Sequence, residues 1–314
     1  MTEHDHRPAL APAGPVPAGP VAVLTNPTAG RGRHADLLPA VLDRLAVAGR
    51  TLRLLTADTP DQALAACHDA VADGAAALVT VGGDGTVHLA LQAVAGTPVA
   101  YGAVPTGTGN DFAADTGFPA DPLAAADAIG AALAAGRTRP VDLARMTGPD
   151  GSVRWFGAVL AAGFDAIVNE RANRMRWPRG RRRYDLAILV ELARLRPRRY
   201  RLVLDGVPHE FDAVLVAVGN CASYGGGLRI CPAADPTDGL LDVVVGGRFD
   251  RRELMRVKPR LARGTHVDHP LVRTFRARTV ELAAHDITAY ADGERATPLP
   301  VTITAVPHAT NLLL

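Results

Sequence analysis

The chain has 314 residues, of which 48% are hydrophobic, and its formal net charge at pH 7 is +2. This length predicts about two domains, each with enough apolar residues for its own core. The near-neutral charge gives no reason to expect a nucleic-acid partner, and no apolar run approaches the roughly twenty residues that cross a bilayer.

The cysteines and the first residues bear on the compartment. Cys67, Cys221 and Cys231 are odd in number and have no CxxC spacing, which argues against a disulfide framework or a zinc site. Residues 1–20 are polar and then rich in Ala, Pro and Gly, without the basic start and apolar stretch of a signal peptide. We therefore expect a disordered tail at 1–20 and a cytoplasmic protein in a reducing environment.

The first part of the chain alternates strand and helix patterns. Apolar strands are predicted at 21–26, 51–56, 77–81 and 99–104, and helices at 37–45, 61–72 and 86–94. Such alternation is typical of an α/β domain, a parallel sheet with helices on both faces, whose ligands bind at the carboxyl ends of the strands. We assign residues 21–140 to this domain.

After Arg139 the pattern changes to pairs of strands joined by turns at 147–151 and 205–206. Further strands are predicted at 200–204, 211–218, 241–245, 279–283 and 287–291. This pattern favours a mainly antiparallel β-sandwich over residues 141–298. A strand at 301–306, within the segment 299–314, fits either domain, and periodicity alone leaves both assignments open.

Two glycine turns follow neighbouring strands, Gly82-Gly83-Asp84-Gly85-Thr86 and the segment 105–112. Glycine frees the backbone to surround an anion, and Thr86 is predicted to begin a helix whose positive end favours the same anion. Asp84 is a hard oxygen ligand suited to Mg²⁺. Together the turns predict a nucleotide phosphate site, although each motif alone also fits an ordinary structural turn.

The second turn adds side chains to this site. Thr106 and Thr108 offer hydroxyls to a phosphate, Asn110 offers a positioning amide and Asp111 a second carboxylate. Asn110 and Asp111 also fit a helix N-cap, and both interpretations are compatible. The loop 26–30 places a similar turn before the first helix. Neither a GxxxxGK[ST] loop nor a GxGxxG fingerprint is present, so a P-loop enzyme and a standard NAD-binding domain are not indicated.

Taken in order, these motifs resemble the diacylglycerol kinase-like lipid kinases, which share a catalytic domain with sphingosine and ceramide kinases. The resemblance runs from Val21 to about Val306. It is carried by Asn26-Pro27-Thr28-Ala29-Gly30, Gly82 to Thr86, Pro105 to Phe112, Gly225-Gly226-Gly227, Asp235 to Asp242 and Asp292-Gly293-Glu294. The GGDGT turn alone is shared with NAD kinases.

The resemblance implies roles for individual residues. Asp84, Asp111 and Asp142 would position the catalytic Mg²⁺, and Glu294 would be the general base that takes the proton of the acceptor hydroxyl. Ala29 and His88 depart from the family pattern, where Ser and Asn are usual. The implied ATP-binding residues are Asn26, Pro27, Thr28, Ala29, Gly30, Thr56, Gly82, Gly83, Asp84, Gly85, Thr86, Val87, His88, Thr106, Gly107, Thr108 and Asn110.

The resemblance also implies a structural Mg²⁺ site, with the carboxylates of Asp235 and Asp238 and the carbonyl of Leu240 as ligands. Without the resemblance, DPTDG reads as an ordinary turn. The segment Arg171 to Arg201 is rich in arginine and contains Trp177 and Tyr184. It fits either a solvated face or a peripheral contact with an anionic membrane.

These observations predict an ATP- and Mg²⁺-dependent lipid kinase with diacylglycerol or a related lipid alcohol as acceptor. The protein would be cytoplasmic or peripheral at the inner membrane surface. An NAD kinase-like enzyme and a non-catalytic nucleotide or lipid sensor remain as alternatives. An exposed edge strand would provide a route to a homodimer.

Overall fold

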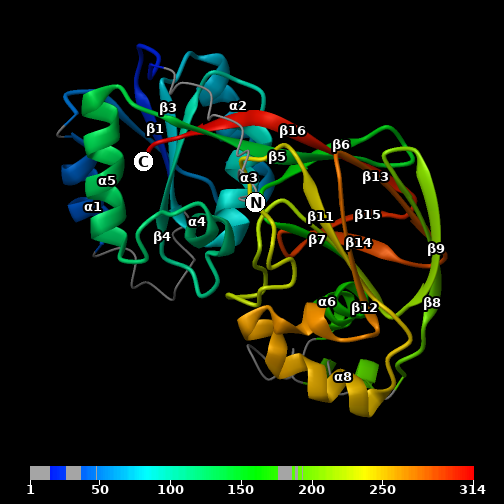
Figure 1. Ribbon diagram of the computed structural model, residues 1–314. Helices are drawn as coiled ribbons and strands as arrows, with labels where there is room; N and C mark the ends of the chain where they lie inside the picture. Colours follow the sequence, from blue (N-terminus) through cyan, green and yellow to red (C-terminus); the bar gives the residue numbers. More distant parts are fainter. Residues whose placement is uncertain (1–14, 26–36, 47, 176–185, 188–189, 193) are drawn as a thin grey trace, which may run out of the picture. The chain divides into compact units, whose positions relative to one another are not determined.

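The computed structural model describes residues 15–25, 37–46, 48–175, 186–187, 190–192 and 194–314. The chain divides into two compact units (Figure 1). Unit 1 comprises residues 1–143, 235–239 and 306–314, and unit 2 comprises residues 144–234 and 240–305. The sequence pattern placed residues 141–298 in one continuous second domain, whereas the structure returns the short segment 235–239 to unit 1.

Unit 1 is built around a parallel sheet in the order β2-β1-β3-β4-β16. Its strands are β1 (Val21–Thr25), β2 (Leu52–Leu55), β3 (Ala77–Gly82), β4 (Ala100–Pro105) and the end of β16 (Val301–Leu312). Every residue of β3 and β4 is buried, as expected for strands covered on both faces.

The helices of unit 1 cover this sheet in two pairs. Helix α1 packs on α5, and α2 packs on α3 at the other side of β1, β3 and β4 (Figure 1). These helices are α1 (Leu38–Ala46), α2 (Pro60–Ala72), α3 (Asp84–Val94) and α5 (Pro122–Ala135), with a short α4 (Asp111–Asp115) after β4. Thr59 and Asp121 begin α2 and α5 by accepting a backbone N–H of the first turn.

Unit 2 is a sandwich of antiparallel strands. One sheet contains β16-β13-β8-β9, and the other has the order β12-β11-β10-β7-β14-β15. The strands are β5 (Arg139–Thr147), β6 (Val153–Phe156), β7 (Val159–Gly163), β8 (Arg198–Leu204), β9 (Val207–Ala213), β10 (Leu215–Gly219), β11 (Leu241–Gly246), β12 (Val272–Ala277), β13 (Thr279–Ala284), β14 (Thr288–Ala291) and β15 (Glu294–Pro298). Strand β5 starts in unit 1 and pairs with β6 from Ala144 onward.

Apolar side chains from both sheets of unit 2 share one buried core. Leu202 and Val280 lie on one sheet, and Val218 and Val243 lie on the other. Short helices lie outside these sheets: α6 (Phe164–Arg174), α8 (Arg251–Val257), η2 (Lys258–Arg263) and η3 (Thr265–Asp268). The predicted combination of an α/β domain with a mainly antiparallel β-sandwich is confirmed.

Three details differ from the sequence-based expectation. The predicted strand 211–218 is two strands in different sheets, because the chain changes sheets at Val214. Helix α3 begins at Asp84 and not at Thr86, since Gly83 is its N-cap. Residues 15–20, predicted as part of the tail, lie against unit 1: Val16 is 8% exposed and donates its N–H to the Gly136 carbonyl. Residues 1–14 lie outside the described residues.

Candidate active site

The strand ends of unit 1 place the two glycine turns at the same edge of the sheet. Thr25 lies beside Val81, and Gly82 lies beside Pro105, so β1, β3 and β4 end together. Gly83 and Thr106 follow these ends directly, and Thr106 donates its N–H to the Gly82 carbonyl at 2.9 Å. This edge is where parallel α/β sheets bind ligands.

Asp84 joins the two turns through its carboxylate. Oδ2 accepts the backbone N–H of Asn110 and Oδ1 that of Asp111, both at 2.8 Å. Helix α4 begins at Asp111, so Asp84 satisfies amides at the start of this helix. Asn110 itself has φ 61° and makes no capping bond to α4. Its side chain instead closes its own turn by bonding both the N–H and the carbonyl of Gly107.

Three glycines allow this close approach. A Cβ on Gly107 would lie 2.6 Å from the Cα of Gly83, and a Cβ on Gly109 would lie 2.3 Å from Oδ2 of Asp84. A Cβ on Gly82 would lie 2.4 Å from the hydroxyl of Thr86. Since Cβ atoms do not approach this closely, the turns need glycine at these three positions for close contact with their neighbours.

The geometry fits a bound phosphate and its metal. The Oγ1 of Thr106 is buried and has no hydrogen-bond partner within the described part of the chain. Helix α3 presents its N-terminus beside it, without a side-chain cap. Asp84 and the buried Asp111 supply hard oxygen ligands of the kind that Mg²⁺ takes.

The remaining predicted nucleotide residues of unit 1 occupy different environments. Thr56 is exposed and follows β2, while Val87 and His88 are buried in α3. Thr108 is exposed in the second turn. The predicted loop Asn26 to Gly30 lies outside the described residues.

Asp142 lies in a second polar arrangement of unit 1. Its carboxylate accepts the N–H of Gly239 at 2.7 Å and the N–H of His308 at 2.8 Å. Its own N–H is donated to the Pro236 carbonyl at 2.8 Å. Asp142 is 1% exposed, and this burial raises its pKa, although the two N–H donors oppose the rise. Asp142 therefore holds the segment 235–239 against β5 and β16.

The predicted metal ligands are only partly grouped. Asp235 accepts both the N–H and the hydroxyl of Thr237, which closes a tight turn. The Asp238 N–H is donated to the Asp235 carbonyl at 3.4 Å. Leu240 belongs to unit 2, which the chain re-enters directly after the segment 235–239. Within the described ranges, no group of three or more His, Cys, Asp or Glu side chains has the arrangement of a metal site.

Glu294 begins β15 in unit 2, directly after the turn Asp292-Gly293. Its side chain is exposed. Asp292 fixes this hairpin, because its carboxylate accepts the N–H of Gly157 at 3.0 Å and that of Ala158 at 2.8 Å. Arg295, the residue after Glu294, forms an ion pair with Glu170, with 3.1 Å between its Nε and the carboxylate oxygen. Glu294 therefore projects from a turn that is held on both sides.

Sequence reasoning missed one partly buried polar pair in unit 2. Tyr224 donates its hydroxyl to Asp165 at 2.6 Å, across 59 residues of sequence. Burial raises the pKa of Asp165, against the opposing effects of Tyr224 and of the Lys258 charge. Next to Tyr224, three glycines with φ between 60° and 93° form a tight loop. This loop, Gly225-Gly226-Gly227, was the only local signal for the pair.

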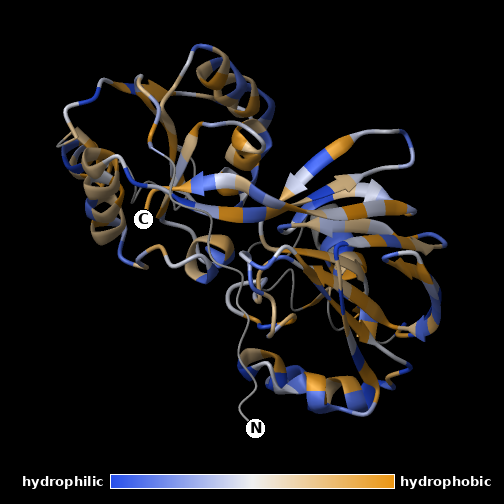
Figure 2. Cartoon of the chain, turned by 45° about the horizontal axis from the view of Figure 1, so that its top comes forward, coloured by the Kyte–Doolittle hydropathy of each residue, from blue (hydrophilic) through white to orange (hydrophobic). Residues whose placement is uncertain are grey.

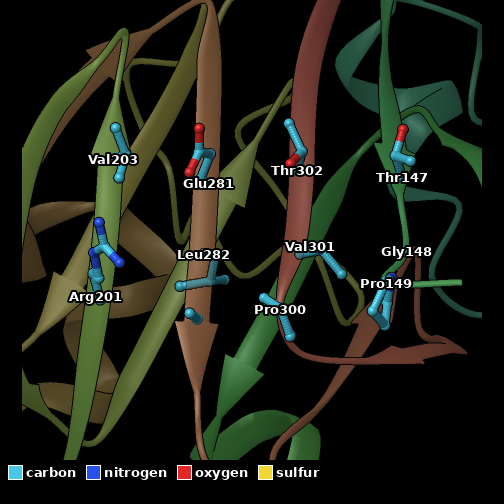
Figure 3. Close-up of a pocket in the computed structure, with 11 residues that line it drawn as sticks. Thr147, Gly148, Pro149, Arg201, Val203, Glu281, Leu282, Pro300, Val301 and Thr302 are labelled. Carbon is cyan, nitrogen blue, oxygen red and sulfur yellow. The ribbon is translucent and has the colours of Figure 1, made fainter. Parts of the chain in front are cut away.

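A pocket of about 390 Å³ lies on one sheet of unit 2, lined from β8, β13 and β16 and from the turn after β5 (Figure 3). Arg201 and Glu281 are its charged residues. It shares no residue with the predicted active site. The part of the chain described here contains no helix long and apolar enough to span a membrane.

Two family models together match most of the chain. Residues 20–146 match the diacylglycerol kinase catalytic domain, and residues 158–314 match the YegS C-terminal NAD kinase beta sandwich-like domain. The second match covers half of the chain and includes Glu294.

Individual relatives agree with these matches. A diacylglycerol kinase of Mycobacterium tuberculosis is 45% identical over 94% of this chain and 95% of its own length. A diacylglycerol kinase of Bacillus subtilis is 26% identical over 88% of this chain and 90% of its own length. The solved structure of a Bacillus anthracis diacylglycerol kinase covers 94% of this chain and 96% of its own, with a TM-score of 0.69 at 21% identity. With 45% identity over nearly the full length, this chain belongs to the diacylglycerol kinase family of lipid kinases.

Proposed function

We propose that this protein transfers the γ-phosphate of ATP to the free hydroxyl of diacylglycerol or a closely related lipid alcohol. The observation that supports the proposal is the bridge from Asp84 to Asn110 and Asp111, which joins two glycine turns at one sheet edge. The Mycobacterium tuberculosis diacylglycerol kinase, at 45% identity, supports the choice of acceptor.

The nucleotide site that we propose consists of backbone amides and short polar side chains. The turns after β3 and β4, with Thr106 and Thr108, would receive the phosphates, and Thr56 and the loop 26–30 would complete the site. Asp84, Asp111 and Asp142 would form the acidic network for the metal. Bound Mg²⁺ would neutralise the charge that develops on the transferred phosphoryl group.

Glu294 is the proposed general base. Its carboxylate would take the proton of the acceptor hydroxyl as that oxygen bonds to the γ-phosphorus, while the bond from this phosphorus to the ADP oxygen breaks. The hydrogen bonds of Asp292 to Gly157 and Ala158 fix the turn that carries Glu294, which favours a constant position for the carboxylate.

A second Mg²⁺ is proposed at Asp235, Asp238 and the Leu240 carbonyl, where it would brace the chain next to Asp142. The donor set is two carboxylates and one carbonyl, and water would complete the octahedron that Mg²⁺ prefers. We further infer a cytoplasmic protein that reaches its lipid at the inner membrane surface.

The test is transfer of labelled phosphate from ATP to a panel of acceptors in mixed micelles: diacylglycerol, sphingosine, ceramide, undecaprenol and NAD. Labelled phosphatidic acid from diacylglycerol is the expected product. Transfer to NAD and to no lipid would overturn the acceptor. ATP binding without transfer to any acceptor would favour a sensor.

A further inference from the structure

Helix α8 and the following η2 form a strongly basic segment of unit 2. Residues 251–263 include six Arg or Lys residues and one acidic residue. The formal charge of the whole chain is only +2, so the rest of the chain is net negative. This segment is therefore one of two concentrations of positive charge in the chain, the other being residues 171–201 with twelve arginines and two acidic residues.

The segment has an apolar inner side and a basic outer side. Val257 is buried in a cluster with Val214 and Phe249, and Leu254 packs against that cluster. Arg252, Arg256 and Lys258 are exposed on the outer side. Figure 2 shows α8 as a run of blue residues interrupted by orange ones. Between these cations lies Met255, a large apolar side chain that is 52% exposed.

In the described part of the chain, most of these cations are not neutralised by acidic side chains, although the charge of Lys258 acts on Asp165. Within the described ranges Arg252, Arg256, Arg260 and Arg263 make no ion pair, and the local acid Glu253 instead bonds the Asp250 N–H in a capping box. The described arginines of the basic segment 171–201 include two that form ion pairs. Among them Arg171 pairs with Glu191, and Arg199 with Glu210.

Part of this charge arrangement works against the stability of α8, although Arg256 in the last turn and the Asp250–Glu253 capping box favour the helix. Arg252 and Arg256 are four positions apart, where like charges repel, and Arg251 and Arg252 occupy the first turn, where the helix dipole disfavours positive charge. Residues that conflict with local stability are typical of functional surfaces.

We propose that the α8–η2 surface, residues 251–263, docks the protein on an anionic lipid bilayer. The cations would lie among the headgroups while Met255 enters the apolar layer beneath them, since stable attachment needs both electrostatic and apolar contributions. The purpose of this contact rests on the proposed function, because diacylglycerol resides in membranes, but vesicle binding can be measured without turnover.

Other partners fit this surface less well. Residues 251–263 contain no aromatic side chain on which a nucleic-acid base would stack. A second copy of the chain would bring like charges together. An anionic bilayer satisfies both the charge and the exposed Met255.

The test is co-sedimentation of the full-length protein with vesicles of phosphatidylcholine alone or mixed with phosphatidylglycerol. We expect binding only to the anionic vesicles, and its loss between about 0.1 M and about 1 M salt, where screening becomes short-ranged. The double variant Arg252→Glu/Arg256→Glu should bind at least tenfold more weakly. Met255→Ser should weaken binding while keeping the salt dependence.

A charge-matched control is Arg145→Glu/Arg154→Glu on β5 and β6, also exposed in unit 2, which should bind as the wild type does. Circular dichroism and thermal unfolding would verify that each variant folds. Equal binding by the α8 variant and the wild type, or equal binding to neutral vesicles, would overturn the proposal. So would retention of a single-stranded oligonucleotide in place of vesicles.

Turnover separates this proposal from the proposed function. With short-chain diacylglycerol in detergent micelles, the α8 variant should keep wild-type activity, because Arg252 and Arg256 are outside the proposed active site. Absence of activity in both proteins would count against the kinase assignment and leave the vesicle result to decide the docking surface.

Discussion

The carboxylate of Asp84, in the first glycine turn, accepts the backbone N–H of Asp111 at 2.8 Å. Asp111 belongs to the second glycine turn and is the first residue of helix α4, so Asp84 fixes the start of that helix. A substitution at one turn is therefore expected to disturb the other. This coupling also separates Asp84 from an ordinary surface carboxylate, whose removal costs little.

Asp84→Asn should lower kcat by about 100-fold or more, because it removes the charge that we propose to hold the metal while keeping the side-chain volume. The asparagine side chain has only one acceptor oxygen, so one of the two backbone N–H groups of Asn110 and Asp111 would lose its acceptor. The free energy of unfolding should therefore also fall by about 1–3 kcal/mol. Steady-state kinetics and urea unfolding measure the two effects. Asp127→Asn, an exposed carboxylate of α5 that pairs with Arg44, is the control and should change neither.

Gly109→Ala should impair nucleotide use without changing any charge. Its Cβ would lie 2.3 Å from Oδ2 of Asp84 and must displace that carboxylate from Asn110. We expect a raised KM for ATP together with a lowered kcat. Gly102→Ala places its Cβ 3.0 Å from the side chain of Ile129 instead, and should lower stability while leaving the KM for ATP unchanged. Wild-type kinetics for Gly109→Ala would contradict the role given to the bridge.

Glu294→Gln should separate catalysis from binding. If this residue takes the proton of the acceptor hydroxyl, kcat should fall by about 10²- to 10⁴-fold while ATP binding is kept. Isothermal titration with ATP and single-turnover phosphate transfer provide the two measurements. Glu281→Gln, another exposed carboxylate of unit 2, should be fully active. Full activity of Glu294→Gln would show that another group is the base.

Asp142→Ala should destabilise unit 1 by about 1–3 kcal/mol, because the amides of Gly239 and His308 would lose their acceptor in a buried site. Asp142→Asn should lie between the alanine variant and the wild type, since its single oxygen replaces only one of the two acceptors. Urea unfolding would give the order of the three proteins. Equal stability of all three would mean that these hydrogen bonds do not hold the segment 235–239.

His266 should make stability depend on pH. It is 3% exposed, and its Nε2 lies 3.0 Å from the Ile230 carbonyl. Burial lowers its pKa from the ordinary value of 6.5, so the unfolded chain binds a proton more readily than the folded chain does. The contribution of neutral, buried His266 to the free energy of unfolding is complete above pH 6.5. It is lost as the pH falls from 6.5 through the lower folded-state pKa, by at most about 1.36 kcal/mol per pH unit.

Replacing His266 by Gln should remove this part of the pH dependence. Thermal unfolding of both proteins between pH 5 and 8 would reveal it as a difference in slope, in the range where histidines titrate. His68→Gln, on the exposed side of α2, should keep the wild-type slope. Parallel curves for wild type and His266→Gln would contradict the expected shift.

Most local elements of unit 1 were predictable from the sequence because they depend on neighbours in the chain, although α5 (Pro122–Ala135) was not among the predicted helices. The apolar runs at 77–81 and 99–104 became β3 and β4, and the glycines that follow them marked the candidate site. Long-range pairings were not predictable in this way. The bonds of Asp84 to Asn110 and of Tyr224 to Asp165 leave no periodic signal, and neither does the parallel pairing of Asn311 with Ala100.

The same limit explains the errors in unit 2. A continuous apolar pattern over 211–218 does not reveal that the chain passes from one sheet to the other at Val214, since both sheets bury the same kinds of side chain. The positions of Asp84, Asp111 and Glu294 in their turns were foreseeable from the motifs. The residues that fix those turns, such as Asp292, became visible only in three dimensions.

Strand β16 pairs with β13 through residues 301–304 and with β4 through residues 311–312. The sheet of unit 1 therefore gains its β16 strand only from residues that the ribosome makes long after β4. Although domains usually fold in the order of synthesis, unit 1 of this chain must wait for the sandwich to be translated before its own sheet is complete.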